Sequence, residues 1–201
     1  ENSGNARLYI TAHGIYNAYI NGKKASDFIL APGTSQYNAR LQYQTYDVSG
    51  LLNVGKNEIL VTVGDGWWRG DTGYGGVRNS FGTDLAILCQ LEIDRKTVLI
   101  SDKSWSASQE GPLGLNDLMQ GECYDARKEN ICEWHPVTEK QFGYENLVCS
   151  NSFDVVEKEN YTGKQIHTPN GEVVIDFGQN IAGYVKFGFY AQAGQCITLY
   201  H

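Results

Sequence analysis

The sequence lacks the clustered positive charge of a nucleic-acid-binding or membrane-surface protein. Its 16 lysines and arginines are scattered among 23 acidic residues, and the formal net charge is −7. Because phosphate backbones and anionic membranes attract clustered basic side chains, neither is an expected partner. No apolar run approaches the roughly 20 residues needed to cross a bilayer. The polar residues 1–6 also lack the charged and apolar sections of a signal peptide.

The cysteines lack the spacing of a metal or redox site. None of the five forms a C-x-x-C pair, and no histidine stands at zinc-finger spacing from them. Their number is odd, and Cys89 lies in the apolar run 85–91. We therefore expect buried, reduced thiols at Cys89, Cys123, Cys132, Cys149 and Cys196.

Helical periodicity is scarce, whereas strand periodicity is present along most of the chain. Residues 7–11 and 16–20 alternate, and the Asn21–Gly22 step after them predicts a hairpin. Further strands are expected over 57–63, 85–93, 96–100, 172–177, 183–190 and 195–200, and single helical turns over 48–52 and 115–120. Short strands with turn residues between them predict an all-β fold, a jelly-roll or galactose-binding-like β-sandwich.

A domain boundary is expected near residues 149–152. A polar stretch, 157–164, follows it and precedes a fresh set of strands. We expect a first β-sandwich domain over 1–150 and the start of a second over 151–201. Because about 50 residues of strand cannot bury a full core alone, the second unit is expected to be incomplete.

Several segments, in this order, carry a resemblance to one family. They are 16–22 (YNAYING), 31–34 (APGT), 43–48 (YQTYDV), 64–70 (GDGWWRG), 121–127 (GECYDAR) and 175–183 (IDFGQNIAG). The first five resemble the N-terminal domain of bacterial α-L-rhamnosidases, glycoside hydrolase family 78. The last resembles the start of the β-sandwich domain that follows in those enzymes.

The resemblance implies an inverting α-L-rhamnosidase whose general acid and base lie in an (α/α)₆ barrel. Inverting glycosidases hold these two carboxyl groups roughly 6.5–9.5 Å apart. In the family the barrel lies C-terminal to all of these segments, so the chain itself is expected to be non-catalytic. The implied partners are rhamnose-containing glycans and the C-terminal catalytic domain of the same protein. The compartment stays open between bacterial cytoplasm, periplasm and secretion.

The segment 65–79 (DGWWRGDTGYGGVRN) is the candidate sugar site. Sugars bind through an aromatic face beside groups that pair with hydroxyls. The candidate residues in this segment are Asp65, Trp67, Trp68, Arg69 and Asn79. The turn after Pro32–Gly33 adds Asn38 and Arg40. The structural alternative is that the tryptophans fill the core, that Arg69 pairs with an aspartate, and that Asn38 and Arg40 cap turns. Because strand side chains alternate, at most one tryptophan should face a ligand.

The resemblance also suggests calcium, because some related sandwich modules bind L-rhamnose with its help. Calcium prefers six to eight oxygen ligands. The candidate ligands are Asp47, Asn79 and Asp84, although relatives often place a proline near Asp84 and this chain has none. The alternative for Asp47 is an aspartate that caps the turn at Val48–Ser49.

Three functions remain open. The first hypothesis is a carbohydrate-recognition module, and the second is an architectural module that packs on the barrel and binds no sugar. The third is an independent enzyme that uses Glu122 and Asp125. The third is disfavoured, because the sequence shows no nucleophile and base. We expect Glu122, Asp125 and Arg127 to form a structural salt bridge instead.

Overall fold

The computed structural model describes residues 4–73, 75–130, 133–188, 190–192, 194–196 and 198. The chain forms two compact units, Glu1–Glu157 and Lys158–His201, which we describe separately. The boundary expected after residue 150 lies a few residues before this division. None of the described helices is long and apolar enough to cross a membrane.

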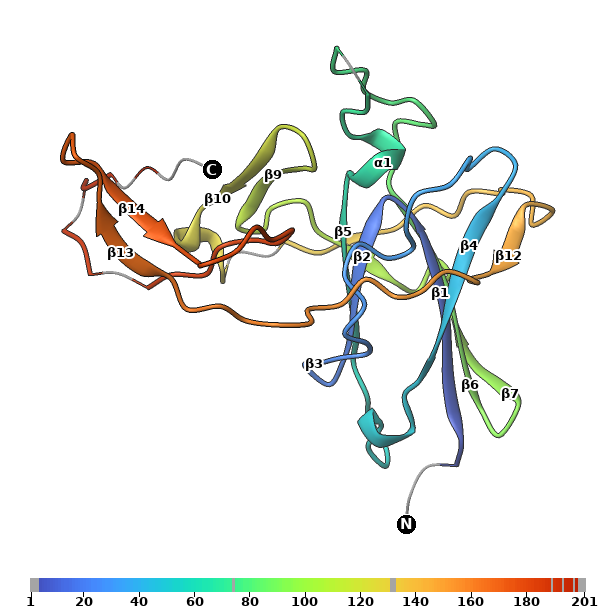
Figure 1. Cartoon of the computed structure of the whole chain (residues 1–201). Helices are drawn as coiled ribbons and strands as arrows, with labels where there is room; N and C mark the ends of the chain where they lie inside the picture. The colour runs from blue at the N-terminus through green and yellow to red at the C-terminus, as the bar shows by residue number, and fades with distance from the viewer. Residues whose placement is uncertain are drawn as a thin grey trace. The chain divides into compact units, whose positions relative to one another are not determined.

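The larger sheet of the first unit has five strands (Figure 1). Its order is β12 (Leu147–Cys149), β4 (Leu41–Asp47), β1 (Ala6–His13), β6 (Ala86–Ile93) and β7 (Lys96–Ile100). All neighbours are antiparallel except β12, which runs parallel to β4. The central strand β1 pairs with β6 over its whole length and with β4 over residues 7–10.

A second sheet of three strands has the order β3 (Lys23–Lys24), β2 (Ile15–Ile20) and β5 (Ile59–Gly64). Two short antiparallel pairs accompany the sheets: β9 (Leu113–Asp117) with β10 (Gly121–Tyr124), and β8 (Ser106–Ala107) with β11 (His135–Pro136). The helical turns are η1 (Ser49–Leu51), α1 (Gly66–Arg69) and η2 (Ala126–Lys128). The fold is an all-β sandwich, as the sequence predicts.

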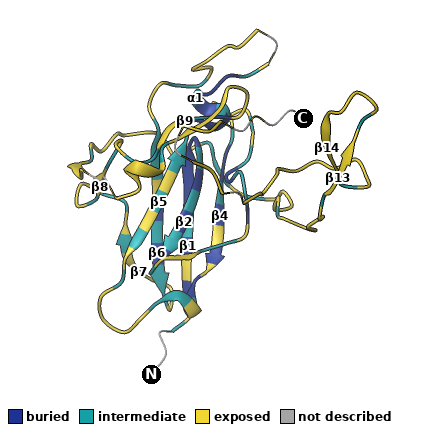
Figure 2. Ribbon diagram, turned by 90° about the vertical axis from the view of Figure 1, so that its left-hand side faces the viewer, coloured by how far each residue is buried: buried dark blue, intermediate teal, exposed yellow. Residues whose placement is uncertain are grey.

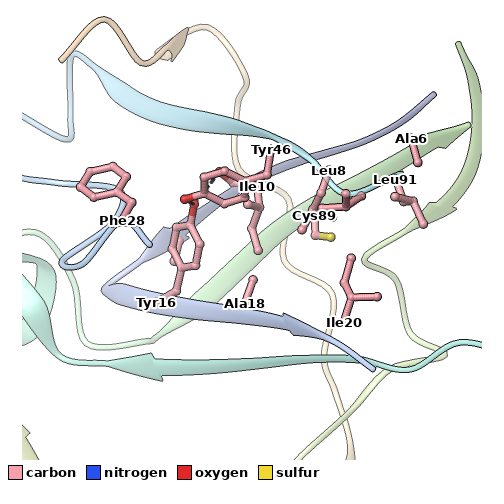
Figure 3. Packing of buried hydrophobic residues seen from close by; sticks show 13 residues of the cluster. Ala6, Leu8, Ile10, Tyr16, Ala18, Ile20, Phe28, Tyr46, Cys89 and Leu91 are labelled. Carbon is pink, nitrogen blue, oxygen red and sulfur yellow. Dashed lines mark hydrogen bonds between the residues drawn. The ribbon is translucent and has the colours of Figure 1, made fainter. Parts of the chain in front are cut away.

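The core lies between the two sheets (Figure 3). Alternate residues of β1 point into it: Leu8 and Ile10 are at most 1% exposed. They meet Tyr16 and Ile20 of β2 and Cys89 of β6 in one apolar cluster. Each large aliphatic side chain buried in this way stabilises the fold by about 1.5–3 kcal/mol. The period-2 pattern of the sequence therefore directs one face of each strand inward.

Two tight turns confirm the hairpin signals. Asn21 and Gly22 join β2 to β3 with φ of 50° and 77°. Asp94 and Arg95 join β6 to β7 with φ of 50° and 65°. Positive φ at both central residues gives the turn that matches the twist of paired strands.

The second unit forms one hairpin in its described part, β13 (Lys164–His167) with β14 (Val173–Asp176). The strand expected over 183–190 is absent from 183–188 and 190, and position 189 lies outside the described residues. Of the strand expected over 195–200, positions 197, 199 and 200 lie outside the described residues, and the others are not in a strand.

Two further expectations are corrected. Residues 115–120 form the end of β9 and a turn, not a helical turn, because Asp117 accepts the backbone N–H groups of Met119 and Gln120. Cys89 is a buried free thiol as expected, but the free thiols Cys123, Cys149 and Cys196 are exposed. Cys132 lies outside the described residues.

Candidate functional site

The candidate sugar-binding segment begins with the helical turn α1, which follows β5 directly. Gly66 permits this junction: its φ is +52°, and a Cβ there would lie 2.6 Å from the Ile15 side chain. Consecutive side chains on a helical turn point about 100° apart. Strand alternation therefore does not decide which tryptophan faces outward, and burial does. Trp68 is 8% exposed, and Trp67 is half-buried.

Trp68 is the centre of a second apolar cluster. Its ring meets the ring of Tyr37 edge to face at a centroid distance of 5.6 Å and lies 6.2 Å from that of Phe81. Its indole N–H donates to the carbonyl of Asp84 at 3.0 Å. The ring packs on two aromatic side chains, and its polar edge is hydrogen-bonded within the protein. Trp68 is therefore packed as a core residue, as the structural alternative expects, and Trp67 is the tryptophan of this segment with more exposed surface.

His13, the last residue of β1, stacks on the ring of Trp68. The imidazole and indole planes are 7° apart, with ring centroids 3.6 Å apart, and the Phe142 ring meets His13 edge to face at 4.6 Å. The imidazole Nδ1 is buried without a hydrogen-bond partner among the described residues. Burial lowers the pKa of His13 from its ordinary value of 6.5, because a charged ring loses its hydration there.

Three buried carboxylates surround the guanidinium of Arg78. Nη2 donates to Asp65 Oδ2 at 2.6 Å, and Nη1 donates to Asp117 Oδ2 at 2.8 Å. Nη1 also lies 3.6 Å from Asp71 Oδ1. The Asp65 carboxylate further accepts Arg69 Nε at 2.8 Å, as the structural alternative for Arg69 predicts. This network, which we call the Arg78 cluster, ties both ends of the loop after α1 to strand β9.

Asp117 is the most deeply buried member of the Arg78 cluster, with a fully covered side chain. Burial alone would raise its pKa. Hydrogen bonds from the backbone N–H groups of Gln120, Asp71 and Met119, together with Arg78, instead hold that pKa below its ordinary value. A carboxylate held by three backbone donors and a guanidinium stays ionised at neutral pH. It fixes structure and is not poised to exchange a proton.

The exposed polar candidates of the site come from two loops, the one fixed by the Arg78 cluster and the turn after Tyr37. Asn79 is exposed and has a φ of 59°, and its backbone N–H donates to the carbonyl of Arg69 at 2.9 Å. Asn38 is exposed in the turn that follows Tyr37, whose ring packs on Trp68. The structure thus brings Asn38, Trp67 and Asn79 to the same end of the sandwich.

Arg40 makes a structural contact within the first unit. One guanidinium nitrogen donates to Asn151 Oδ1, and Nε is buried without a partner among the described residues. The side chain therefore joins its turn to the segment after β12, as a structural residue does.

The three candidate calcium ligands do not converge. Asp47 lies opposite Arg7 at the start of β1. Asp84 lies at the other end of this strand, because its carbonyl accepts the indole N–H of Trp68, which stacks on His13. Arg7 and His13 are about 20 Å apart at the rise per residue of a strand. Asp47 accepts the N–H and hydroxyl of Ser49 at 3.0 and 2.7 Å, as its turn-capping alternative predicts. The Asp84 carboxylate forms an ion pair with Lys140. The three residues therefore do not fit one calcium ion.

No group of three or more His, Cys, Asp or Glu in the described ranges is arranged to hold a metal ion. Calcium stays a prediction without a shared ligand set. The expected salt bridge of the 121–127 segment is present between Arg127 and Asp125 at 2.8 Å, but Glu122 is not part of it.

Comparison with known proteins places this geometry in a family. Residues 1–166 match the alpha-L-rhamnosidase N-terminal domain, and residues 166–201 match the bacterial alpha-L-rhamnosidase concanavalin-like domain. An alpha-L-rhamnosidase of Streptomyces avermitilis is 35% identical over 98% of this chain, and one of Formosa agariphila is 35% identical over 86%. This chain spans about a fifth of the length of these relatives: 20% and 19%.

Solved structures agree. The α-L-rhamnosidase of Aspergillus terreus is 37% identical with a TM-score of 0.82, covering 90% of this chain and 23% of its own. The Streptomyces avermitilis enzyme, solved with L-rhamnose, is 33% identical with a TM-score of 0.79, covering 90% and 19%. The sandwich, the order of its sequence segments and these matches agree with one another, and the chain belongs to the alpha-L-rhamnosidase N-terminal domain family.

Proposed function

We propose that this chain is the non-catalytic N-terminal region of an inverting α-L-rhamnosidase and that the α1 end of its sandwich helps to recognise rhamnosyl groups. The observation that carries the proposal is the Arg78 cluster, which ties the loop bearing Asn79 to Asp65, just before α1, and to Asp117 of β9, while Trp67 of α1 keeps part of its surface exposed. A fixed loop loses little entropy on binding. An aromatic side chain beside amide and guanidinium donors is the chemistry that sugars require.

The same cluster supports the non-catalytic part of the proposal. A glycosidase acid must give up a proton near the working pH. Asp65, Asp71 and Asp117 are buried against Arg78, and the pKa of Asp117 is lowered. These carboxylates are thus committed to the fold, and hydrolysis is assigned to the remainder of a protein about five times longer, judged from its relatives. An assay with an aryl α-L-rhamnoside should give no rate above the uncatalysed one, and turnover would contradict this assignment.

An NMR titration of the ¹⁵N-labelled chain with L-rhamnose tests the recognition role. We expect saturable shifts of the backbone amides of α1 and of residues 78–81, with the β13–β14 hairpin unaffected. The titration is repeated with added calcium, because calcium dependence would show that a ligand set forms around the sugar. No shift at millimolar sugar in either condition would contradict the proposal.

The architectural alternative also has a specific observation in its favour. The β9–β10 hairpin exposes apolar side chains: Leu113 (41%), Met119 (67%) and Tyr124 (52%). Exposed apolar groups gathered on one element mark contact surfaces. If the chain binds no sugar, this hairpin is the surface on which we expect it to pack against the catalytic part of the protein.

A further inference from the structure

The outer side of the five-stranded sheet is open at the end where β1 begins. Leu8 and Ile10 of β1 point into the core, so Arg7 and Tyr9 point to the opposite side. At the far end of β1 that outer side is covered, because His13 stacks under Trp68. Figure 2 shows that β1 and β4 are mostly buried near α1, whereas exposed residues alternate with buried ones towards the N-terminus.

A cavity of about 540 Å³ lies on this open part of the sheet. Its lining comes from β1 and the residue before it, from β6 and from the turn after β6: Asn5, Arg7, Tyr9, Glu92, Asp94 and Arg95. The volume falls within the roughly 300–1,000 Å³ of small-molecule sites. Tyr43 of β4 stands beside the cavity, its ring centroid 6.4 Å from that of Tyr9 and its plane tilted by 60°.

The polar groups of this cavity are largely uncommitted. Asp94 Oδ1 accepts the backbone N–H of Asn5 at 3.0 Å, and Glu92 Oε1 accepts Gln90 Nε2 at 2.8 Å. Arg7 and Arg95 form no side-chain hydrogen bond or ion pair with any other described residue. The guanidinium groups of two exposed arginines therefore offer donors around a tyrosine, with carboxylate acceptors beside them.

Charge and shape indicate the class of ligand. The lining contains two arginines and two acidic residues, so its formal charges cancel. The cavity therefore favours neither an anion nor a cation. A nucleic acid would require an excess of basic groups. A neutral polyhydroxyl compound matches aromatic faces flanked by both donors and acceptors. The 60° tilt between the two tyrosine rings suits a chain of sugars, whose successive rings are not coplanar.

We propose that this surface, the Tyr9 face (Arg7, Tyr9, Tyr43, Glu92, Asp94 and Arg95), binds a neutral oligosaccharide segment of the glycan. The proposal adds to the function above, and rests on it only in taking the parent protein to act on glycans. The α1 end would meet a terminal rhamnosyl group. The Tyr9 face, at the other end of β1, would hold sugars farther along the chain.

Calorimetric titration with neutral tetrasaccharides of glucose, galactose, xylose or rhamnose, each at millimolar concentration, tests the Tyr9 face. We expect saturable binding of at least one of them. Tyr9→Ala should weaken that binding by about tenfold, Tyr9→Phe should retain it, and Tyr144→Ala, which removes an exposed tyrosine elsewhere, should leave it unchanged. Arg7→Gln should also weaken it by about tenfold, and serves if Tyr9→Ala fails to fold.

The two sites give separable results. L-rhamnose binding that Trp67→Ala removes and Tyr9→Ala spares concerns only the α1 end. Tetrasaccharide binding that Tyr9→Ala weakens and Trp67→Ala retains supports the Tyr9 face, even if L-rhamnose alone does not bind. Absence of binding for every tetrasaccharide, or binding unaffected by Tyr9→Ala and Arg7→Gln in folded protein, would overturn the proposal and leave the surface to a protein contact.

Discussion

The imidazole of His13 lies flat against the indole of Trp68, with the two ring centroids 3.6 Å apart. His13 ends the central strand of the larger sheet, and Trp68 belongs to α1. This contact joins the candidate sugar-binding segment to the most buried strand of the fold. The position of Trp67, the neighbouring residue in α1, therefore depends on how well this stack is maintained.

The stack makes stability depend on pH. Burial places the folded-state pKa of His13 below 6.5, its ordinary value in the unfolded chain. Below pH 6.5 the unfolded state therefore binds this proton more readily than the folded state does. The contribution of neutral His13 is complete above pH 6.5 and is lost progressively as the pH falls towards the folded pKa, by at most about 1.4 kcal/mol per pH unit.

Urea unfolding at pH 7.5 and 5.5 measures this loss, with His13→Phe as the matched variant. Phenylalanine keeps an aromatic ring against Trp68 and removes both the titrating group and the unpaired Nδ1. We expect the wild-type protein to lose more stability between the two pH values than the variant. Equal losses would show that the charge on His13 does not control stability.

Trp68→Ala should destabilise the first unit by about 3–5 kcal/mol, because it removes a buried aromatic side chain and leaves a cavity between Tyr37, Phe81 and His13. Trp67→Ala should cost clearly less, because its side chain is half-buried. Chemical denaturation followed by circular dichroism gives both values. A larger loss for Trp67→Ala would contradict the assignment of Trp68 as the core residue.

Asp117→Asn should destabilise the protein by about 2–3 kcal/mol. The two carboxylate oxygens of Asp117 accept hydrogen bonds from three backbone N–H groups, and the substitution replaces one of these oxygens with an NH₂ group that cannot accept. It also removes one of the negative charges that pair with Arg78. Asp47→Asn is the matched control, since Asp47 also accepts a backbone N–H two residues on but is exposed. Thermal unfolding compares them, and equal costs would argue against a structural role for the Arg78 cluster.

Thiol reactivity should divide the four described cysteines into two classes. Cys89 is 2% exposed, and burial raises its pKa to about 12, so the reactive thiolate is scarce and covered. The exposed thiols Cys123, Cys149 and Cys196 should react with Ellman's reagent in the native protein. Mass spectrometry should find Cys89 labelled only after denaturation, and fast native labelling of Cys89 would contradict the packing of the core.

The sequence predicts the strands and turns of the sandwich well, because their signals are local. The alternation of residues 7–11 is the burial pattern of β1, and the Asn21–Gly22 step is the hairpin between β2 and β3. The family resemblance is also local, since it rests on short segments that keep their order. Neither the prediction of strands and turns nor the family resemblance therefore requires knowledge of which strands pair in the sheets.

The site could be predicted only in part, because its contacts are distant in the chain. Asp117 is 39 residues from Arg78, and no sequence pattern pairs them. Likewise, burial of Trp68 depends on His13 and Tyr37, which precede it by more than 30 residues. What the sequence does contain is the capping signal of Asp47 at Ser49 and the pairing of Arg69 with Asp65 four residues before it.

The recognition role is tested most directly by calorimetric titration of the 201-residue chain with L-rhamnose, alone and with calcium. Trp67→Ala is the test variant, and Trp134→Ala, which removes a tryptophan 52% exposed elsewhere, is the control. We predict saturable binding that Trp67→Ala abolishes and Trp134→Ala retains. Absence of binding at millimolar sugar in both conditions, or binding indifferent to Trp67, would contradict the recognition role and favour the architectural one.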